Sequence, residues 1–111
     1  MLNLLVIRSK DIEQSRQFYE LLGLNFEPHQ HGQDAPHFAA EQNGFVFEIY
    51  PCRGKDTTAT RFGFGVNHLE ATFDSLIAAG AQVVSAPQDS PWGKRAVIKA
   101  PDGHMVELMA Q

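Results

Sequence analysis

The sequence predicts an α+β fold built from two β-α-β-β-β modules in tandem, and three observations carry this prediction. Each half of the chain presents the same order of patterns: an apolar strand, an amphipathic helix, and three more short strands. Gly23 and Gly80 each follow the helical run, at the interval that also separates Asp11 from His68. Asn-Gly and Pro-Asp-Gly turns separate short strands in both halves. We therefore expect one domain over residues 1–111, with an internal repeat.

The first module is expected to span about residues 1–51. Its helix should begin at Asp11, which with Gln14 three positions later resembles a capping box, and should end at Gly23. The strands are expected before and after this helix, in the stretches LNLLVIRS, LNFEPH, APHFAAEQ and GFVFEIYP.

A polar linker, residues 52–60, leads to the second module, about residues 61–111. Its helix is expected to begin near His68 and to stop at Gly80. Its strands are expected in RFGFGVN, AQVVSAP, KRAVIKA and HMVELMA.

Alternation along the strands predicts which side chains point away from the core. Phe47 and Ile49 should point to one face of their strand, and Val46, Glu48 and Tyr50 to the other. We therefore expect the face that carries Glu48 to form the wall of a polar cavity. A solvated charge on an edge strand is the alternative.

The second module repeats this feature. Glu107 alternates with Val106 and Leu108 in the last strand. In the strand from residue 61, Arg61 shares a face with two glycines, and glycine in a strand often marks a place where another group approaches the backbone. A buried carboxylate without a partner is costly, so we expect a partner or water beside Glu107.

Composition limits the partners. The net charge is −4 with dispersed basic residues, which argues against nucleic acid, and the N-terminal apolar run meets charge at Arg8, too soon for a membrane span or signal peptide. The single cysteine, Cys52, fits a reducing compartment. We expect a cytoplasmic protein whose partner is a small molecule or another protein.

The stretches DIEQSRQFYELLGL and APDGHMVEL, together with the duplicated order, resemble the vicinal-oxygen-chelate superfamily of glyoxalase I, extradiol dioxygenases, and bleomycin- and fosfomycin-resistance proteins. This resemblance implies two modules whose mixed sheets curl around a central cavity. It also implies a homodimer.

Metal-dependent members of the family take one ligand from the first and one from the last strand of each module. The resemblance maps the last-strand ligands onto Glu48 and Glu107, and the first-strand ligands onto Leu4 and Arg61. Leucine has no donor atom and arginine stays protonated. We therefore predict no cofactor and no metal, with Glu48 and Glu107 as the ligands if one binds, and expect Arg61 to pair with one of these glutamates.

The remaining candidate residues are apolar, aromatic or histidine side chains near the predicted cavity. His29 and His31 form an H-x-H pair that could chelate zinc but is more typical of an exposed loop, while His68 and His104 are expected to be structural. Trp92 could stack on a ligand or cover an interface. The predicted ligand-binding residues are Leu4, Val46, Tyr50, His37, Phe38 and Trp92.

Three functions follow from these residues. The first is metal-independent binding of a small molecule, in the manner of the bleomycin-resistance-like proteins, with a cationic ligand favoured by an acidic cavity. The second is a lyase, isomerase or dioxygenase in which Glu48 or Glu107 acts as a general base with a raised pKa and Arg61 stabilises an enolate or carboxylate. The third is an interaction module without a ligand.

Overall fold

The computed structural model describes residues 4–30, 32–33, 35–52 and 60–111. The chain divides into two compact units, residues 1–58 and 59–111, which are described separately below. The described residues form two helices and eight strands, in the order β-α-β-β-β within each unit. The predicted α+β fold class and the internal repeat are therefore confirmed. His31 and most of the predicted linker, residues 53–59, lie outside the described residues.

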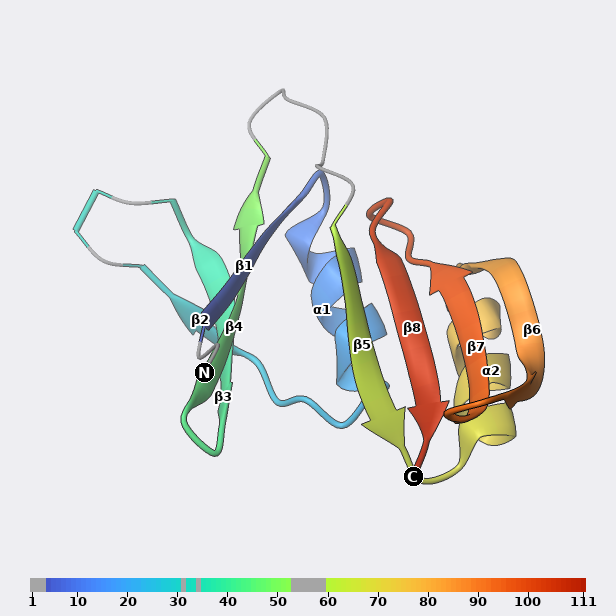
Figure 1. The fold of residues 1–111 in the computed structure, drawn as a ribbon. Helices are drawn as coiled ribbons and strands as arrows, with labels where there is room; N and C mark the ends of the chain where they lie inside the picture. Colours follow the sequence, from blue (N-terminus) through green and yellow to red (C-terminus); the bar gives the residue numbers. More distant parts are fainter. Residues whose placement is uncertain (1–3, 31, 34, 53–59) are drawn as a thin grey trace. The chain divides into compact units, whose positions relative to one another are not determined.

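Unit 1 is a four-stranded mixed sheet with one helix (Figure 1). Its strand order is β1-β4-β3-β2, with β1 parallel to β4 and the other pairs antiparallel. The elements are β1 (Leu4–Ser9), α1 (Ile12–Glu20), β2 (Glu27–His29), β3 (His37–Gln42) and β4 (Phe45–Pro51).

Unit 2 repeats this topology, with strand order β5-β8-β7-β6 and β5 parallel to β8. The elements are β5 (Arg61–Val66), α2 (Leu69–Ala78), β6 (Gln82–Ser90), β7 (Gly93–Lys99) and β8 (Met105–Ala110). The matching orders explain why the two halves of the sequence carry the same series of patterns.

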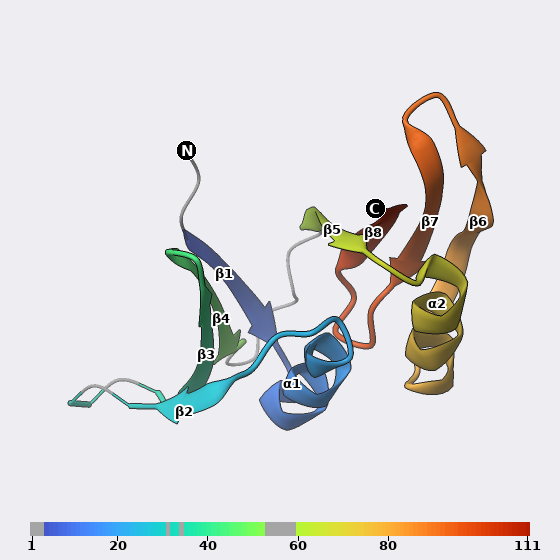
Figure 2. The same cartoon turned by 90° about the horizontal axis from the view of Figure 1, so that it is seen from below.

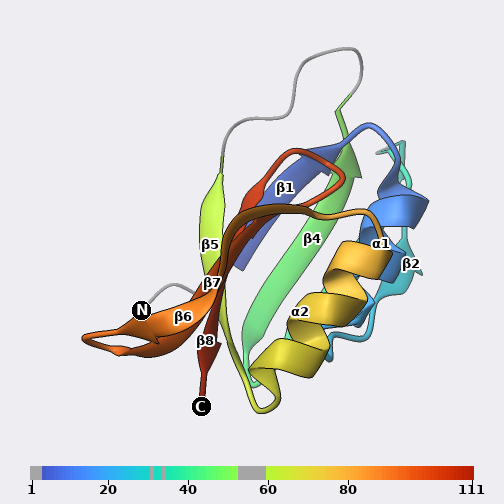
Figure 3. The ribbon, with the colours of Figure 1, turned by 90° about the vertical axis from the view of Figure 1, so that its right-hand side faces the viewer.

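Strand β6 is longer than the sequence predicted, because it continues through Pro87 to Ser90. Its pairing with β7 shifts register between Val83 and Ser85 and again between Ser85 and Gln88, and the strand bends strongly along its length (Figure 3). Such irregularities bend a strand and accommodate a proline at the edge of a sheet. Proline here therefore marks an irregular edge strand and not its end.

The ends of the helices follow the predicted signals in part. Asp11 caps α1, since its Oδ1 accepts a hydrogen bond of 3.0 Å from the backbone N–H of Gln14. His68 precedes α2 but makes no such side-chain bond. Gly23 and Gly80 have positive φ, +93° and +110°, as expected for glycines that end helices. Neither described helix has the length and apolar character needed to cross a membrane.

Each helix covers one face of its own sheet (Figure 2). In unit 1, Phe18 and Tyr19 of α1 are buried, and Tyr19 packs on Phe47 with ring centroids 5.3 Å apart. The same side of the sheet buries Ile7 and Ile49. These contacts form the core of unit 1, on the face that alternation had predicted.

The core of unit 2 is built in the same way. Val106 and Leu108 of β8 are fully buried, as are Ile98 of β7 and Leu76 of α2. His104 is also buried, and its ring lies 6.3 Å from that of Phe62, in line with the structural role expected for it. The opposite face of each sheet carries the glutamate of its last strand, Glu48 in unit 1 and Glu107 in unit 2.

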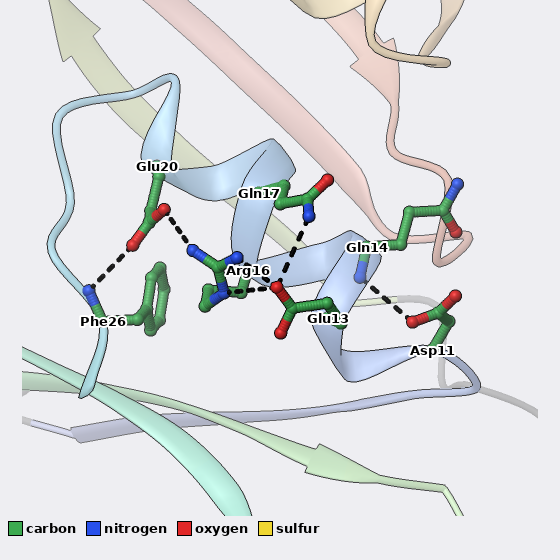
Figure 4. A network of polar contacts seen from close by, with 7 residues as sticks. All are labelled: Asp11, Glu13, Gln14, Arg16, Gln17, Glu20 and Phe26. Carbon is green, nitrogen blue, oxygen red and sulfur yellow. Dashed lines mark hydrogen bonds and ion pairs between the residues drawn. The ribbon is translucent and has the colours of Figure 1, made fainter. Parts of the chain in front are cut away.

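A polar network fixes the loop that leaves α1 (Figure 4). Arg16 pairs with Glu13, and its Nη1 lies 2.6 Å from Glu20 Oε1. Glu20 Oε2 in turn accepts a 3.3 Å hydrogen bond from the backbone N–H of Phe26, so one carboxylate joins the helix to the segment before β2. The Arg16 guanidinium also lies 5.5 Å from the centre of the Phe38 ring.

Candidate functional site

A row of rings crosses the open face of the unit 1 sheet, with one residue from each strand. The Arg8 guanidinium of β1 lies 5.3 Å from the Tyr50 ring of β4, which stacks on His37 of β3 at 4.0 Å and 10°. His37 stacks in turn on His29 of β2 at 6.0 Å and 29°. We call these four residues the ring row; they are cross-strand neighbours on one face of the sheet.

Glu48 lies in the next row of the same face. Its Cα partners are Val6 on β1 and Ala39 on β3, and Ala39 is paired with Glu27 on β2. The Glu48 Oε2 atom lies 3.3 Å from Nε2 of His37, whose Nδ1 is 3.1 Å from the carbonyl oxygen of Ala35. The buried imidazole therefore connects the ring row to this carboxylate.

A pocket of 450 Å³ opens beside Glu48, entirely within unit 1. Three of its lining side chains are carboxylates, and none of the described residues that line it is lysine or arginine. The small side chain of Ala39 stands between Glu27 and Glu48, which leaves space above the sheet. The lining residues are Asn25, Glu27, His29, Ala39, Ala40, Glu41, Val46 and Glu48.

The predicted ligand-binding residues of unit 1 divide between the two faces of the sheet. Val46 lines the pocket, Leu4 is its partner on β1 and is half exposed, and Tyr50 belongs to the ring row. Phe38 is placed elsewhere, because its strand partner is the buried Ile49 and its ring lies against Arg16 on the side of the helix. It does not line the pocket.

The histidines correct one expectation. A solvated position was favoured for the histidines of this loop, with His37 the likeliest to contact a ligand. His37 is instead only 1% exposed, and its ring stacks on Tyr50. His29 lines the pocket and was not predicted to do so. Strand β2 has only three residues, too few for alternation to show which side chains face the sheet surface.

On the open face of unit 2, two arginines converge on Glu107. Arg95 on β7 places Nε at 2.9 Å and Nη2 at 2.6 Å from Oε1, while Arg61 on β5 places Nε at 3.4 Å and Nη2 at 3.2 Å from Oε2. The pairing of Arg61 with a glutamate was predicted, but Arg95 was missed. We call these three residues the arginine–glutamate triad.

The two guanidinium groups set the protonation of Glu107. Hydrogen bonds from Arg95 first, and from Arg61 next, hold the pKa of the Glu107 carboxyl below its ordinary value of 4.5 against the opposing effect of burial. This direction is opposite to the raised pKa that was expected of a general base at Glu107. The carboxylate is stabilised as an anion.

This shift predicts a pH dependence of stability. A carboxyl whose pKa is lower in the folded state stabilises the fold above its unfolded pKa, and the contribution is lost as pH falls through the folded pKa. We expect Glu107→Gln to lower the free energy of unfolding by about 1 kcal/mol at pH 7, since the carboxylate is partly exposed, and by less below pH 4.5. Urea denaturation at pH 7 and pH 3 measures both values; an equal loss at both pH values would contradict the assignment.

Trp92 lies in the turn between β6 and β7 and is 79% exposed. A ligand contact by this ring remains a prediction. His68 is also exposed, beside the start of α2.

The donor atoms do not fit the metal that the family resemblance implies. Leu4 offers none, and Arg61 places a guanidinium against Glu107 where a first-strand ligand was expected. Within the part of the chain that the structure describes, no group of three or more His, Cys, Asp or Glu side chains is arranged to hold a metal ion.

Comparison with known families agrees with this fold. The model of the Glyoxalase/Bleomycin resistance protein/Dioxygenase superfamily matches residues 1–108. The chain belongs to this superfamily. No curated protein sequence matches it.

Solved structures of low sequence identity share the fold. The antibiotic binding protein TnmS3 from Streptomyces sp. CB03234 has a TM-score of 0.77 at 20% identity, over 99% of this chain and 94% of that one. A glyoxalase-related enzyme from Fulvimarina pelagi has a TM-score of 0.75 at 22% identity, over 100% and 88%. A glyoxalase I mutant from Zea mays has a TM-score of 0.82 at 21% identity, over 97% of this chain and 45% of that one.

Proposed function

We propose that this protein binds a small cationic molecule, one that carries an amine, in the unit 1 pocket, and that it does so without a metal. The observation that carries the proposal is the pocket lining: Glu27, Glu41 and Glu48 bring three carboxylates, with no lysine or arginine among the described lining residues. Glu27 and Glu41 form no ion pair with another described residue. An ammonium group would supply the missing positive charge.

Size and surface support the same ligand class. The volume of 450 Å³ lies within the range of about 300–1,000 Å³ that is usual for pockets holding small molecules. Ala39 and Val46 offer apolar contact, and the carboxylates can accept charge-assisted hydrogen bonds from an amine. A protein of the same fold, TnmS3, is described as antibiotic binding, which supports a binding role without defining the ligand here.

Isothermal titration with phenethylamine, and with 2-phenylethanol as its neutral counterpart, tests the charge preference. We expect phenethylamine to bind more tightly and its affinity to fall as NaCl is raised, because salt screens exposed charges. Glu41→Gln and Glu48→Gln should each weaken binding roughly fivefold, the effect of removing one partly exposed charge pair. Asp74→Asn, an exposed residue of α2 outside the pocket, is the control and should leave affinity unchanged.

Two results would contradict the proposal. One is equal binding of the amine and the alcohol, which would remove the role of charge. The other is an equal response of affinity to Asp74→Asn and Glu48→Gln, which would mean that net charge and not the pocket attracts the ligand.

A metal-free lyase or isomerase is the second candidate, and the His37–Glu48 contact favours it. The Glu48 carboxylate borders the pocket and lies 3.3 Å from a buried imidazole, so it could take a proton from a bound substrate. Turnover of a carbonyl substrate that Glu48→Gln abolishes and Glu41→Gln preserves would favour this function over binding alone.

We also propose that the protein is a cytoplasmic homodimer. The family resemblance supports the dimer, and the single buried cysteine, Cys52, suits a reducing compartment. Light scattering distinguishes a mass near 12.3 kDa for a monomer from twice that value.

A further inference from the structure

We infer that unit 2 carries a second binding site, on the open face of its sheet, for a small molecule that bears a carboxylate. The site consists of the arginine–glutamate triad and the strand β5 beside it. It is built from other residues than the unit 1 pocket and does not depend on the function proposed for that pocket.

The charges of the triad do not balance. Arg61 and Arg95 carry two positive charges and Glu107 carries one negative charge, which leaves one unit of positive charge on the triad. Each guanidinium directs only Nε and Nη2 at Glu107, and no other described side chain accepts a hydrogen bond from either arginine. Since a guanidinium has five N–H donors, both retain donors for a second anion.

Strand order places the charges side by side. Glu107 is on β8, which lies between β5 with Arg61 and β7 with Arg95. The central carboxylate therefore lies between two guanidinium groups on neighbouring strands. One arginine would have been enough to neutralise Glu107; the second adds repulsion that a bound carboxylate would relieve.

Strand β5 leaves space beside the triad. Gly63 is the Cα partner of Glu107, and a Cβ built there would make only ordinary contacts of 3.5 and 3.7 Å with Glu107. Its φ is not in the left-handed region, so the backbone does not require glycine. Glycine weakens a strand and often marks a place where another group approaches the backbone, and here it leaves the surface between Arg61 and Glu107 open.

The surroundings favour a carboxylate with an apolar body. Met105 and Met109 lie on the same face of β8, one on each side of Glu107, and both are half-buried. Thioether side chains adapt to irregular apolar surfaces. An aromatic carboxylate can therefore place its charge near the arginines and its ring near a methionine.

Titration of the full-length protein with sodium benzoate, followed by NMR chemical shifts, tests this site, with benzyl alcohol as the neutral control. We expect benzoate, but not benzyl alcohol, to shift the signals of β5, β7 and β8. Arg61→Gln should weaken benzoate binding roughly fivefold, and Arg61→Lys should weaken it less. Lys94→Gln is the matched control, because Lys94 is an exposed cation of unit 2 that pairs with Glu70, and this variant should leave affinity unchanged.

The Glu107→Gln variant tests whether the triad binds a ligand or only stabilises the fold. Removing the central negative charge while keeping both arginines should strengthen benzoate binding roughly threefold, as long as the melting temperature shows that the variant is folded. Weaker binding in this variant, an equal effect of Lys94→Gln and Arg61→Gln, or no benzoate-specific shift would each overturn the inference and assign the triad to stability alone.

Discussion

Replacement of Leu108 by alanine is expected to lower the free energy of unfolding by about 2–5 kcal/mol, the largest loss of any single change considered for unit 2. The Leu108 side chain is fully buried on the face of β8 that α2 covers. Its removal exchanges apolar contacts for a cavity. The neighbouring Met109 points to the open face and is half-buried, so Met109→Ala should cost about 1 kcal/mol or less.

Urea denaturation monitored by circular dichroism measures both losses. Leu108→Met is the matched control, since it preserves volume and should cost less than about 1.5 kcal/mol. Similar losses for Leu108→Ala and Met109→Ala would contradict the assignment of the two faces of β8, and with it the placement of Glu107 on the open face.

Alternation in the sequence was sufficient to predict these two faces. Phe47 and Ile49 are buried, and Glu48 between them is not; Val106 and Leu108 repeat the pattern around Glu107. The physical reason is that a strand with a helix on one side must bury every second side chain. The internal repeat supplied a second reading of the same pattern, which is why the fold class could be predicted with the order of its elements.

The partners of the glutamates were harder to predict. Arg95 precedes three consecutive buried residues, Ala96 to Ile98, so its strand shows no clear alternation. Glu41 alternates with the same period as His37 and Ala39, so the sequence already indicated that these three side chains lie on one face of β3. Glu27 lies in β2, which has only three residues, too few for alternation to show the face on which Glu27 lies. Cross-strand neighbours depend on register, and register is set by turns and packing that a single strand does not reveal.

The two units show how one fold can carry different sites. Both place a glutamate on the last strand, opposite the third residue of the first strand, yet Glu48 has a histidine beside it and Glu107 has two arginines. The pocket of unit 1 is therefore acidic, whereas the triad of unit 2 has excess positive charge. Since fold alone does not define function, the neighbours of each glutamate are the basis for proposing different ligands in the two units.

The second large effect is expected at His37 in unit 1. His37→Ala should lower the free energy of unfolding by about 3 kcal/mol, because it removes a buried ring and leaves the Ala35 carbonyl without its side-chain partner. It also removes the stacking partner of Tyr50. His29→Ala, in the same ring row but only half-buried, should cost about 1 kcal/mol or less.

His37→Phe separates packing from polar contact at this position. A phenyl ring can keep the stacking on Tyr50 but offers no nitrogen to Ala35 or Glu48, so it should recover part of the stability lost in His37→Ala. If His37 also positions Glu48, both variants should weaken phenethylamine binding, whereas a purely structural role would leave the affinity of the folded His37→Phe protein unchanged. Urea denaturation and isothermal titration of the same samples distinguish the two roles. Stability of His37→Ala equal to that of the parent would contradict the buried position of this ring.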